Sequence, residues 1–461
     1  MTAVTALNQS VVEELAALLG ERCSTSAGVR DHHSHDESWH HPHQLYVVVF
    51  PNDTEEVSSI VRICARHRVP VIAYGTGTSL EGNVIPVAGG VVVDLANFDR
   101  VLQVNAEDLD VTVQARVTRK QLNEYLRDRG LFFPIDPGAD ASLGGMAATR
   151  ASGTNAVRYG TMRENVLALT VVLADGGVIR TSRRARKSAA GYDLTRLFVG
   201  SEGTLGIITE VTLRLYGIPE AMAAAVCSFD TLEGAVNTVI QTIQLGVPVA
   251  RIELLDDVQM DSVNRYSKLD YPVKDTLFLE FHGTERGVAE QAETVQGIAA
   301  ENGGAQFRWA TKPEERNHLW KARHDVTYAN KSLKPGREIW ATDVCVPISH
   351  LAQCILESKQ DLRASFLTAP LVGHVGDGNF HLGYLIDPNN PDEIAEAERL
   401  NDRLVMRALA LDGTCTGEHG IGLGKQKFLI AEHGEAVSVM RQLKQALDPL
   451  NILNPGKILP S

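Results

Sequence analysis

Two short segments near the end of the sequence combine side chains that bind metal ions and move protons. The first segment holds His374 and His381 on either side of an Asp-Gly pair, and the second holds the neighbours Glu418 and His419 among four glycines. Two imidazoles and one carboxylate, with coordination positions left open, form a donor set typical of catalytic divalent cations. The spacing favours such a centre, but two surface histidines on a hairpin and an unrelated acidic turn fit it equally well.

These side chains need elements that bring them together. The Asp-Gly pair at positions 377 and 378 predicts a β-hairpin with a two-residue turn. With that turn, His374 lies directly opposite His381 on one face, with Cβ atoms roughly 5 Å apart. The glycines around Glu418 and His419 predict a turn, which can direct two neighbouring side chains to one site.

Three glycine-rich segments earlier in the sequence indicate a nucleotide ligand. They cover residues 75–83, 137–161 and 200–215, and the first follows a predicted strand. Glycines allow the backbone to approach a ligand closely, and successive N–H groups can cradle a pyrophosphate. The dinucleotide fingerprint is not met, because Leu80 follows the first two glycines where a third would be needed, and Gln426 breaks the P-loop pattern. Tight turns without a ligand are the alternative.

A change of pattern near residue 217 divides the sequence into two parts. Before it, alternating strand and helix patterns predict an α/β arrangement, with helix N-caps at Asp53 and Thr118. After it, residues 221–310 read as strand, helix, strand, short helix, strand, helix and strand. That order predicts a ferredoxin-like layer, in which helices cover one face of an antiparallel sheet.

Composition narrows the class and location of the protein. The 461 residues carry 44 basic and 57 acidic side chains, a net charge of −13, which argues against a nucleic-acid partner. The six cysteines include no C-x-x-C pair, which disfavours an iron–sulfur cluster and fits a reducing, intracellular compartment. The N-terminus predicts an amphipathic helix with a capping box from Ser10 to Glu13 rather than a signal peptide, and no transmembrane segment is predicted. We expect a cytoplasmic protein, with peripheral attachment to a membrane left open.

The glycine-rich segments together resemble the FAD-binding domain of flavoproteins related to vanillyl-alcohol oxidase. They are most similar to the branch of FAD-linked D-2-hydroxy acid dehydrogenases, which includes D-lactate dehydrogenase, the glycolate oxidase flavin subunit and D-2-hydroxyglutarate dehydrogenase. The resemblance extends to the closing DPLNILNPGKILP. It implies an α+β fold, with a two-lobed FAD-binding domain of vanillyl-alcohol-oxidase type and a ferredoxin-like antiparallel-sheet cap. The implied parts are an N-terminal helix and lead-in (1–41), the FAD-binding domain (42–217), the substrate and metal cap (218–439) and a C-terminal segment returning to the FAD domain (440–461).

The resemblance also implies which residues hold FAD. Binding should be noncovalent, because the first glycine loop offers no histidine for attachment. The pyrophosphate would lie on the backbone of Gly75, Thr76, Gly77, Thr78, Ser79 and Leu80. The isoalloxazine and adenine ends would be lined by Pro137, Ser142, Gly145, Ser152, Gly153, Glu202 and Ile208, with Asn454 returning to the flavin.

By the same resemblance, His374, His381 and Glu418 bind Zn²⁺ or Mn²⁺, and His419 is the general base. A 2-hydroxy acid would chelate the cation through its hydroxyl and one carboxylate oxygen, which lowers the pKa of the hydroxyl group. His419 would then take the hydroxyl proton, and a hydride would pass from Cα to flavin N5.

A helix covering residues 319–332 supplies the substrate contacts in this interpretation. The spacing of Arg323 and Thr327 places them on one face of that helix. Arg323 resembles the carboxylate-binding arginine of the family, and a guanidinium suits a bidentate contact. A solvent-exposed helix arginine is the alternative.

One departure from the family bears on the substrate. Members that oxidise D-2-hydroxyglutarate have a lysine before the strand that here ends at Pro347, whereas this sequence has Ala341 in that region and Asp343 nearby. We therefore expect D-lactate or a larger monocarboxylic D-2-hydroxy acid. The segments ATDVCVP and TCTGEHGIG are also most similar to those of the D-lactate dehydrogenase members. The alternatives are a D-2-hydroxyglutarate or glycolate dehydrogenase, and a non-redox flavin transferase resembling alkyl-glycerone-phosphate synthase.

The sequence does not name the electron acceptor. No haem or cluster site is apparent, so electrons would leave to a quinone, a cytochrome, an electron-transfer flavoprotein or oxygen, and a homodimer is left open.

Two further runs of residues have competing interpretations. The histidine-rich segment 30–43 favours a lead-in loop over a metal-binding module, and the basic run 180–187 favours a solvated loop over a docking site for a redox partner.

Overall fold

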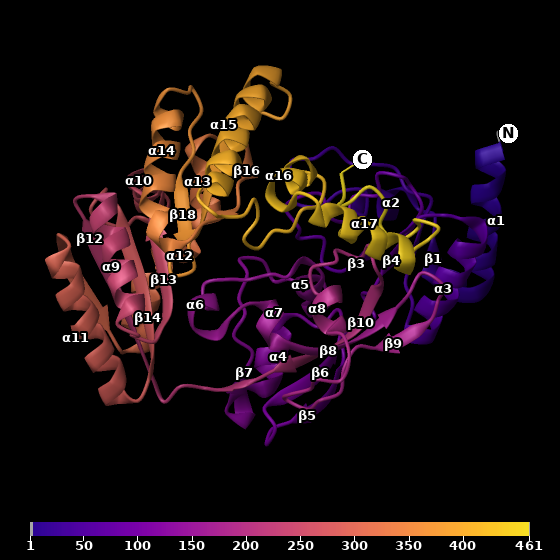
Figure 1. Ribbon diagram of the computed structural model, residues 1–461, viewed down its shortest axis with the longest axis horizontal. Coiled ribbons are helices and arrows are strands. Elements are labelled where there is room, and N and C mark those ends of the chain that lie inside the picture. Colours follow the sequence, from indigo (N-terminus) through magenta and orange to yellow (C-terminus); the bar gives the residue numbers. More distant parts are fainter. Residues whose placement is uncertain (1–2, 461) are drawn as a thin grey trace. The chain divides into compact units, whose positions relative to one another are not determined.

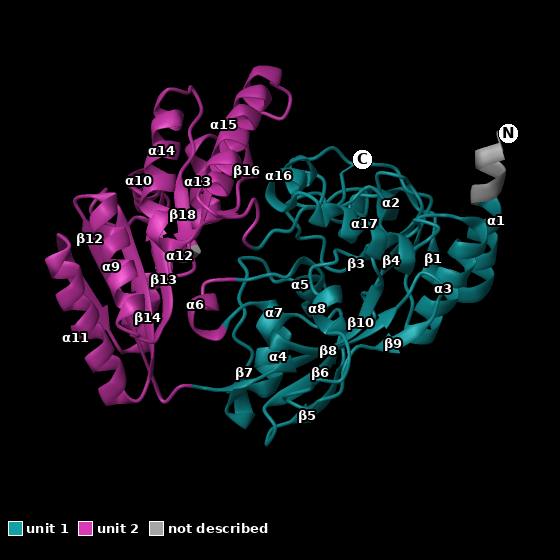
Figure 2. Ribbon diagram, in the orientation of Figure 1, with its two compact units in different colours: residues 1–152, 160–218, 418–461 teal, residues 153–159, 219–417 magenta. Residues whose placement is uncertain are grey.

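The computed structural model describes residues 3–460, which pack as two compact units (Figures 1 and 2). Unit 1 is formed by the chain up to Ser152, by Gly160–Ile218 and by the chain from Glu418 onward; unit 2 is formed by Gly153–Tyr159 and Pro219–Gly417. Unit 1 therefore includes residues 418–439, which the sequence analysis assigned to the cap. The four parts named there and their bounds stay a prediction.

The first sheet of unit 1 is built from short, valine-rich strands that are buried on both faces. Its order is β1 (Cys23–Ser24), β2 (Val47–Val49), β4 (Val91–Asp94) and β3 (Val71–Tyr74), and the last three strands are parallel. Such continuous apolar strands are typical of parallel sheets. The helices packed with this sheet include α1 (Ala3–Leu19) and α3 (Thr54–His67). Asp53 caps α3 by accepting a hydrogen bond from the amide of Glu56, as predicted.

The free edge of that sheet is covered by the C-terminal segment. The amide of Val71 donates to the carbonyl oxygen of Ile452 at 2.7 Å, and the amide of Asn454 donates back to Val71 at 2.9 Å. Leu453 therefore forms a parallel bridge with Val71. These bonds hold the C-terminal segment against the first sheet of unit 1.

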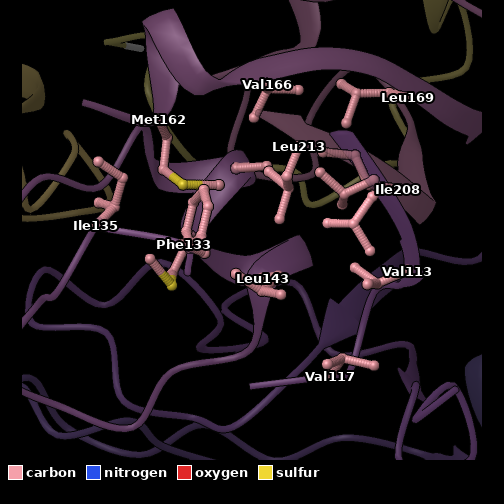
Figure 3. Packing of buried hydrophobic residues seen from close by; sticks show 14 of the residues in the cluster. Val113, Val117, Phe133, Ile135, Leu143, Met162, Val166, Leu169, Ile208 and Leu213 are labelled. Atoms are coloured by element: carbon pink, nitrogen blue, oxygen red, sulfur yellow. The ribbon is translucent and has the colours of Figure 1, made fainter. Parts of the chain in front are cut away.

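The second sheet of unit 1 is antiparallel and lies over a large apolar cluster (Figure 3). Its order is β5 (Val101–Asn105), β6 (Asp110–Gln114), β10 (Ile207–Arg214), β8 (Val166–Val172) and β9 (Val178–Arg180). Thr118 and Gln121 form the predicted capping box of α4. The remaining elements are α2 (Ala27–His32), α4 (Arg119–Leu126), β7 (Leu131–Phe132), α5 (Leu143–Thr149), α7 (Met162–Asn165), α8 (Leu194–Phe198), β11 (Tyr216–Gly217), α16 (Leu429–His433) and α17 (Ala436–Leu447).

Unit 2 contains one eight-stranded sheet with the predicted ferredoxin-like order at one end. That end reads β15 (Gly304–Ala310), β12 (Ala221–Phe229), β14 (Thr276–Gly283) and β13 (Val249–Leu255), all antiparallel. The sheet continues with β18 (Leu371–His374), β19 (Asn379–Ile386) and β16 (Glu338–Ala341), and β17 (Val344–Cys345) also pairs with β19.

Helices pack on both faces of this sheet, whereas the sequence analysis expected them on one. α9 (Leu232–Gln244) and α11 (Glu285–Glu301) lie side by side on one face (Figure 1). On the other face, Ala224 and Phe278 pack against Trp320 of α12. The other helices of unit 2 are α6 (Ala156–Tyr159), α10 (Asp257–Ser267), α12 (Pro313–His324), α13 (Val326–Leu333), α14 (Leu351–Arg363) and α15 (Pro391–Ala410).

Two helix predictions are wrong in detail. The N-terminal helix is already formed at Ala3, so Ser10 and Glu13 lie inside it and do not form a capping box at its start. The single helix expected over 319–332 is interrupted at Asp325, where ψ is 0° and α12 ends. The carboxylate of Asp325 accepts a hydrogen bond from Ser267 at the end of α10, which ties the interruption to a neighbouring helix. Among the described helices, none is long and apolar enough to cross a membrane.

Candidate functional site

A fully buried carboxylate forms the centre of the polar region in unit 2. Glu253 lies on β13, where apolar neighbours alternate with it, and its side chain is 0% exposed. One carboxylate oxygen lies 2.7 Å from Nδ1 of His374, and the other accepts a hydrogen bond from Nε of Arg323 at 2.7 Å. The strand pairing of β13 with β18 brings His374 to this carboxylate, and α12 brings Arg323. One acidic group thus holds two of the predicted site residues.

The charge of Glu253 is maintained by those two partners. Burial by itself raises the pKa of this carboxyl group, but its interactions with His374 and Arg323 bring that pKa below its ordinary value. An anionic Glu253 fixes the tautomer of His374, because the proton must sit on Nδ1 to be donated. The lone pair of His374 is then on Nε2.

His381 is held in the same way by a different acceptor. Its Nδ1–H donates to the backbone carbonyl oxygen of Thr342 at 2.8 Å, and Asp343 lies 3.7 Å from the same nitrogen. The rings of His374 and His381 are 5.4 Å apart between centroids and nearly perpendicular, at 80°. Histidines that bind metals commonly donate their other ring nitrogen to a carboxylate or a carbonyl group. The donor pair therefore suits a cation bound through two Nε2 atoms.

The register of this hairpin differs from the prediction. His374 is paired with Asn379, and His381 is paired with Val372. The turn contains four residues, Val375–Gly378, rather than two. Asp377 and Gly378 are only the second half of this turn. The register is shifted by two residues, and side chains on a strand alternate with a period of two. Both imidazoles therefore stay on one face, as a diagonal pair instead of a facing pair.

Asp343, for which no role at the site was predicted, organises the loops next to the hairpin. Its buried carboxylate accepts hydrogen bonds from Nδ2 of Asn379 at 2.8 Å and from Oγ1 of Thr416 at 2.7 Å. Its carbonyl oxygen accepts from the amide of Gly417 at 3.2 Å. Gly417 is the last residue of unit 2, and Glu418 follows it directly. The sequence signal that could have pointed to Asp343 is its position directly before β17, the short strand that pairs with β19 of the histidine hairpin.

The two predicted substrate residues do not share one helix. Arg323 is in the last turn of α12, whereas Thr327 is in α13 beyond the interruption at Asp325 and is exposed. The i+4 relationship expected for a continuous helix is therefore absent. The structure brings Arg323, but not the side chain of Thr327, to Glu253.

In unit 1, the loop 75–80 has an unusual set of unused donors. Within residues 3–460, none of its six amide N–H groups donates to a protein acceptor. Gly77 has a φ of +69°, and a Cβ atom on Gly75 would lie 2.3 Å from Oγ of Ser142. Successive free amides in a glycine loop form an anion-binding concavity. This loop fits the pyrophosphate of FAD.

Several other predicted flavin residues are linked to that loop. The amide of Ser142 donates to Oγ1 of Thr76 at 3.3 Å, and Oγ of Ser142 accepts from the amide of Gly145 at the start of α5. At the other end of α5, the amide of Glu202 donates to the carbonyl oxygen of Ala148. The structure thus joins the loop 75–80, α5 and the turn at Glu202 in one continuous arrangement.

Asn454 reaches the same arrangement from the C-terminal segment. Its Nδ2 donates to the carbonyl oxygens of Glu202 at 2.7 Å and Asn83 at 2.8 Å. Its Oδ1 and the hydroxyl oxygen of Ser201 are buried and have no hydrogen-bond partner among the described residues. Such atoms fit the donors and acceptors of a bound ligand.

The other predicted flavin residues differ in their surroundings. The carboxylate of Glu202 accepts hydrogen bonds from the amides of Ile421 and Gly422, and burial raises its pKa. Ile208 packs in the apolar cluster of Figure 3. Pro137 is half-buried in the loop before α5, Ser152 is buried at the end of the first stretch of unit 1, and Gly153 begins the short stretch that belongs to unit 2.

The two runs with competing interpretations are partly used in packing. In the histidine-rich segment, Nε2 of His33 lies 2.9 Å from Asp94, and Asp36 accepts from Oγ of Ser79 in the loop 75–80 at 3.0 Å. In the basic run, Arg184 pairs with Asp108 and Asp110.

Two family models match the chain. A model described as an FAD binding domain matches residues 46–182, and a model described as the C-terminal domain of FAD linked oxidases matches residues 218–458. The FAD prediction is thereby confirmed.

Named relatives cover nearly the whole chain. A Danio rerio protein named probable D-lactate dehydrogenase, mitochondrial, is 55% identical over 463 residues, which cover 99% of this chain and 93% of the relative. An Arabidopsis thaliana protein named D-lactate dehydrogenase (cytochrome), mitochondrial, is 47% identical, covering 98% of this chain and 80% of the relative. Both names place the relatives in mitochondria, and the cytoplasmic location expected here stays a prediction.

A solved structure supports the architecture. The crystal structure of p-cresol methylhydroxylase with substrate bound has a TM-score of 0.81 at 18% identity, covering 98% of this chain and 97% of that one. At this level of identity the likeness concerns the fold alone, and the predicted vanillyl-alcohol-oxidase type of fold is confirmed.

Proposed function

The chain belongs to the family of FAD-linked oxidases, and on that basis we propose that this FAD-dependent enzyme oxidises D-lactate, or a larger monocarboxylic D-2-hydroxy acid, to the 2-oxo acid. The observation that carries the proposal is Glu253, which holds an imidazole and a guanidinium from two different elements. The guanidinium suits a substrate carboxylate and the imidazole suits a cation at the hydroxyl group, which are the two functional groups of a 2-hydroxy acid.

FAD, when bound, supplies an acceptor for a hydride. The amides of Gly75–Leu80 would hold its pyrophosphate, because these donors lack acceptors within residues 3–460. Ser142, Glu202 and Asn454 would position the rest of the cofactor, with Pro137, Gly145, Ser152, Gly153 and Ile208 as further lining. Binding would be noncovalent, since the loop contains no histidine.

A divalent cation, Zn²⁺ or Mn²⁺, would be held by His374, His381 and Glu418. The two imidazoles fit this role because their Nδ1–H groups are committed to Glu253 and Thr342. Glu418 follows Gly417 directly in the chain, and the amide of Gly417 donates to the carbonyl oxygen of Asp343. A bound cation would lower the pKa of the substrate hydroxyl group.

The protein side chains handle the remaining proton and charge. Arg323 would bind the substrate carboxylate, with Thr327 as a second contact. His419 would take the hydroxyl proton as the Cα hydride passes to the flavin, leaving a carbonyl group.

Residues 338–345 contain no lysine or arginine, and the carboxylate of Asp343 is bonded to Asn379 and Thr416. This strand therefore offers no cation to a second substrate carboxylate.

The acceptor that reoxidises the flavin would be external, either a quinone, a cytochrome or an electron-transfer flavoprotein. One relative carries a cytochrome in its name.

The test uses the purified protein with a panel of D- and L-2-hydroxy acids and an artificial electron acceptor. We expect D-lactate to reduce the acceptor and L-lactate not to. His374→Ala should lose the bound metal and turnover while keeping the flavin absorbance. A protein that keeps FAD but reduces no acceptor with any 2-hydroxy acid would contradict the proposal and favour the non-redox transferase alternative.

A further inference from the structure

A buried ion pair in unit 1 lies beside the proposed general base. Glu81 and Lys425 are almost completely buried, and Nζ of Lys425 lies 2.8 Å from Oε1 of Glu81. The same carboxylate oxygen lies 3.7 Å from Nδ1 of His419, whose side chain is 11% exposed. Glu81 comes from the segment after the flavin loop, 338 positions before His419 in the chain. Neither Glu81 nor Lys425 has a role in the substrate or cofactor contacts proposed above.

Glu81 also determines the path of the backbone around His419. Its carbonyl oxygen accepts hydrogen bonds from the amides of Leu423 at 2.7 Å and Gly424 at 3.4 Å. A Cβ atom on Gly422 would lie 2.1 Å from that carbonyl oxygen, and one on Gly424 would lie 2.4 Å from Oε2 of the carboxylate. Gly422 and Gly424 are therefore needed because this segment folds closely around Glu81.

Two other side chains reinforce this arrangement. Nδ2 of Asn83 lies 3.4 Å from the carbonyl oxygen of His419, and it also donates to Glu202. His40 borders the space at Gly424, and burial lowers the pKa of its ring. A neutral His40 does not compete with His419 or Lys425 for the charge of Glu81.

The chemistry of a general base gives this carboxylate a function. A carboxylate facing Nδ1 selects the tautomer with the proton on Nδ1, which leaves the lone pair on Nε2 for the substrate. The same carboxylate stabilises the imidazolium that forms when the proton is taken. The 3.7 Å between Nδ1 of His419 and Glu81 is longer than a hydrogen bond, and catalytic contacts of this kind are often long in the absence of substrate and shorten when it binds. Lys425 keeps the buried carboxylate charge-balanced in the meantime.

We propose that Glu81 is a positioning residue for His419, and that Lys425 holds Glu81 in place. The inference rests on the proposed function, in which His419 takes the hydroxyl proton. Glu81 contacts neither substrate nor flavin in this role, so it acts on the rate of the chemical step rather than on binding.

The first experiment is Glu81→Gln in the FAD-loaded full-length enzyme, assayed with D-lactate and an artificial acceptor. We expect kcat to fall by about 10²-fold, because the loss of a carboxylate behind a catalytic imidazole acts on the transition state. KM should change less than about threefold and the flavin content should be unchanged. The kinetic isotope effect on kcat with C2-deuterated D-lactate should increase as the chemical step becomes slower. An unchanged kcat would overturn the proposal.

A second set of variants separates positioning from folding. Glu81→Gln with Lys425→Met removes both buried charges, so the pair leaves no unpaired ion, and kcat should stay low while the flavin content remains that of the native enzyme. In a His419→Gln background, Glu81→Gln should cause almost no further loss. Equal losses in both backgrounds would show that Glu81 does not act through His419. Full turnover in His419→Gln alone would instead contradict the proposed function, so the two failures are distinguishable.

Discussion

Glu253 and His374 are joined by a 2.7 Å hydrogen bond between adjacent strands in the middle of the unit 2 sheet. The carboxylate is fully buried and is shared with Arg323. One side chain therefore sets the tautomer of a proposed metal ligand and the position of a proposed carboxylate-binding group. Because Glu253 is buried, substituting it leaves the protein surface unchanged and tests its contacts with His374 and Arg323.

Glu253→Gln should weaken metal binding. The glutamine keeps the size of the side chain but removes the charge that orients His374, and loss of such a partner lowers metal affinity about 10- to 100-fold. Metal content and affinity, measured on the FAD-loaded protein, check this expectation. Glu280→Gln is the matched control, because Glu280 is also buried and paired, with Arg251 and His282. Equal metal loss in both variants would contradict a specific role for Glu253.

Arg323→Lys should impair substrate binding while leaving the flavin in place. A lysine cannot keep the bond to Glu253 and also offer a planar pair of donors to a substrate carboxylate. We expect KM for D-lactate to rise about 10- to 100-fold, a loss typical of a charged hydrogen bond. Steady-state kinetics measure this. Arg407→Lys serves as the control, since Arg407 is similarly buried but pairs with Glu357 and Asp361 between α14 and α15.

Gly77→Ala should reduce the affinity for FAD. Its φ is +69°, which costs an L-residue about 1 kcal/mol, and the new Cβ would lie 2.1 Å from the hydroxyl oxygen of the buried Tyr74. The loop must therefore shift, and its amides with it. Titration of the apoprotein with FAD, followed by absorbance, measures the change. Gly130→Ala has a φ of +66° but open space around it, so it reports the backbone cost alone. Similar losses of FAD affinity in both variants would argue against pyrophosphate binding by the amides of the loop 75–80.

Asp275→Asn should stabilise unit 2 above pH 6. Burial is the main cause that raises the pKa of Asp275 to about 6, despite Lys359 at 3.8 Å, and one carboxylate oxygen has no hydrogen-bond partner in the described chain. The folded state thus keeps a proton that the unfolded state has lost. The carboxyl group lowers stability progressively as the pH rises from about 4 to about 6, and the penalty is complete above that.

The size of the stabilisation by Asp275→Asn follows from the difference between the pKa of Asp275 in the folded and the unfolded state. An asparagine resembles the protonated form, so its free energy of unfolding at pH 7.5 should exceed that of the native enzyme by about 1–3 kcal/mol, with little difference at pH 4. Denaturant unfolding at the two pH values measures it. Asp230→Asn is the control, since Asp230 is 73% exposed in its pair with Lys274. A constant difference across the pH range would be inconsistent with the raised pKa.

Local patterns predicted the elements well because each depends on neighbours in the chain. The strand expected at VARIELL is β13, and the caps at Asp53 and Thr118 are present. The order of strands and helices after residue 217 also determined the ferredoxin-like end of the sheet, since crossover rules leave few other topologies.

Contacts between distant residues could not be predicted in this way. Nothing in β13 indicates that Glu253 meets a histidine 121 positions later, and nothing near Glu81 indicates Lys425. The helix over 319–332 is interrupted at Asp325, whose carboxylate is bonded to Ser267 on α10, a tertiary contact that the helical pattern does not show. The hairpin at His374 kept its face in spite of the wrong turn length, since an even shift preserves the alternation of side chains.

The bridge between Val71 and Leu453 has a consequence for biosynthesis. The strand that leads into the flavin loop emerges from the ribosome early, yet its edge partner is translated only after all of unit 2. The nascent flavin-binding region must therefore wait, with an unpaired strand edge exposed, through some 380 codons. The unfinished polypeptide is therefore the form of this protein that most needs a chaperone.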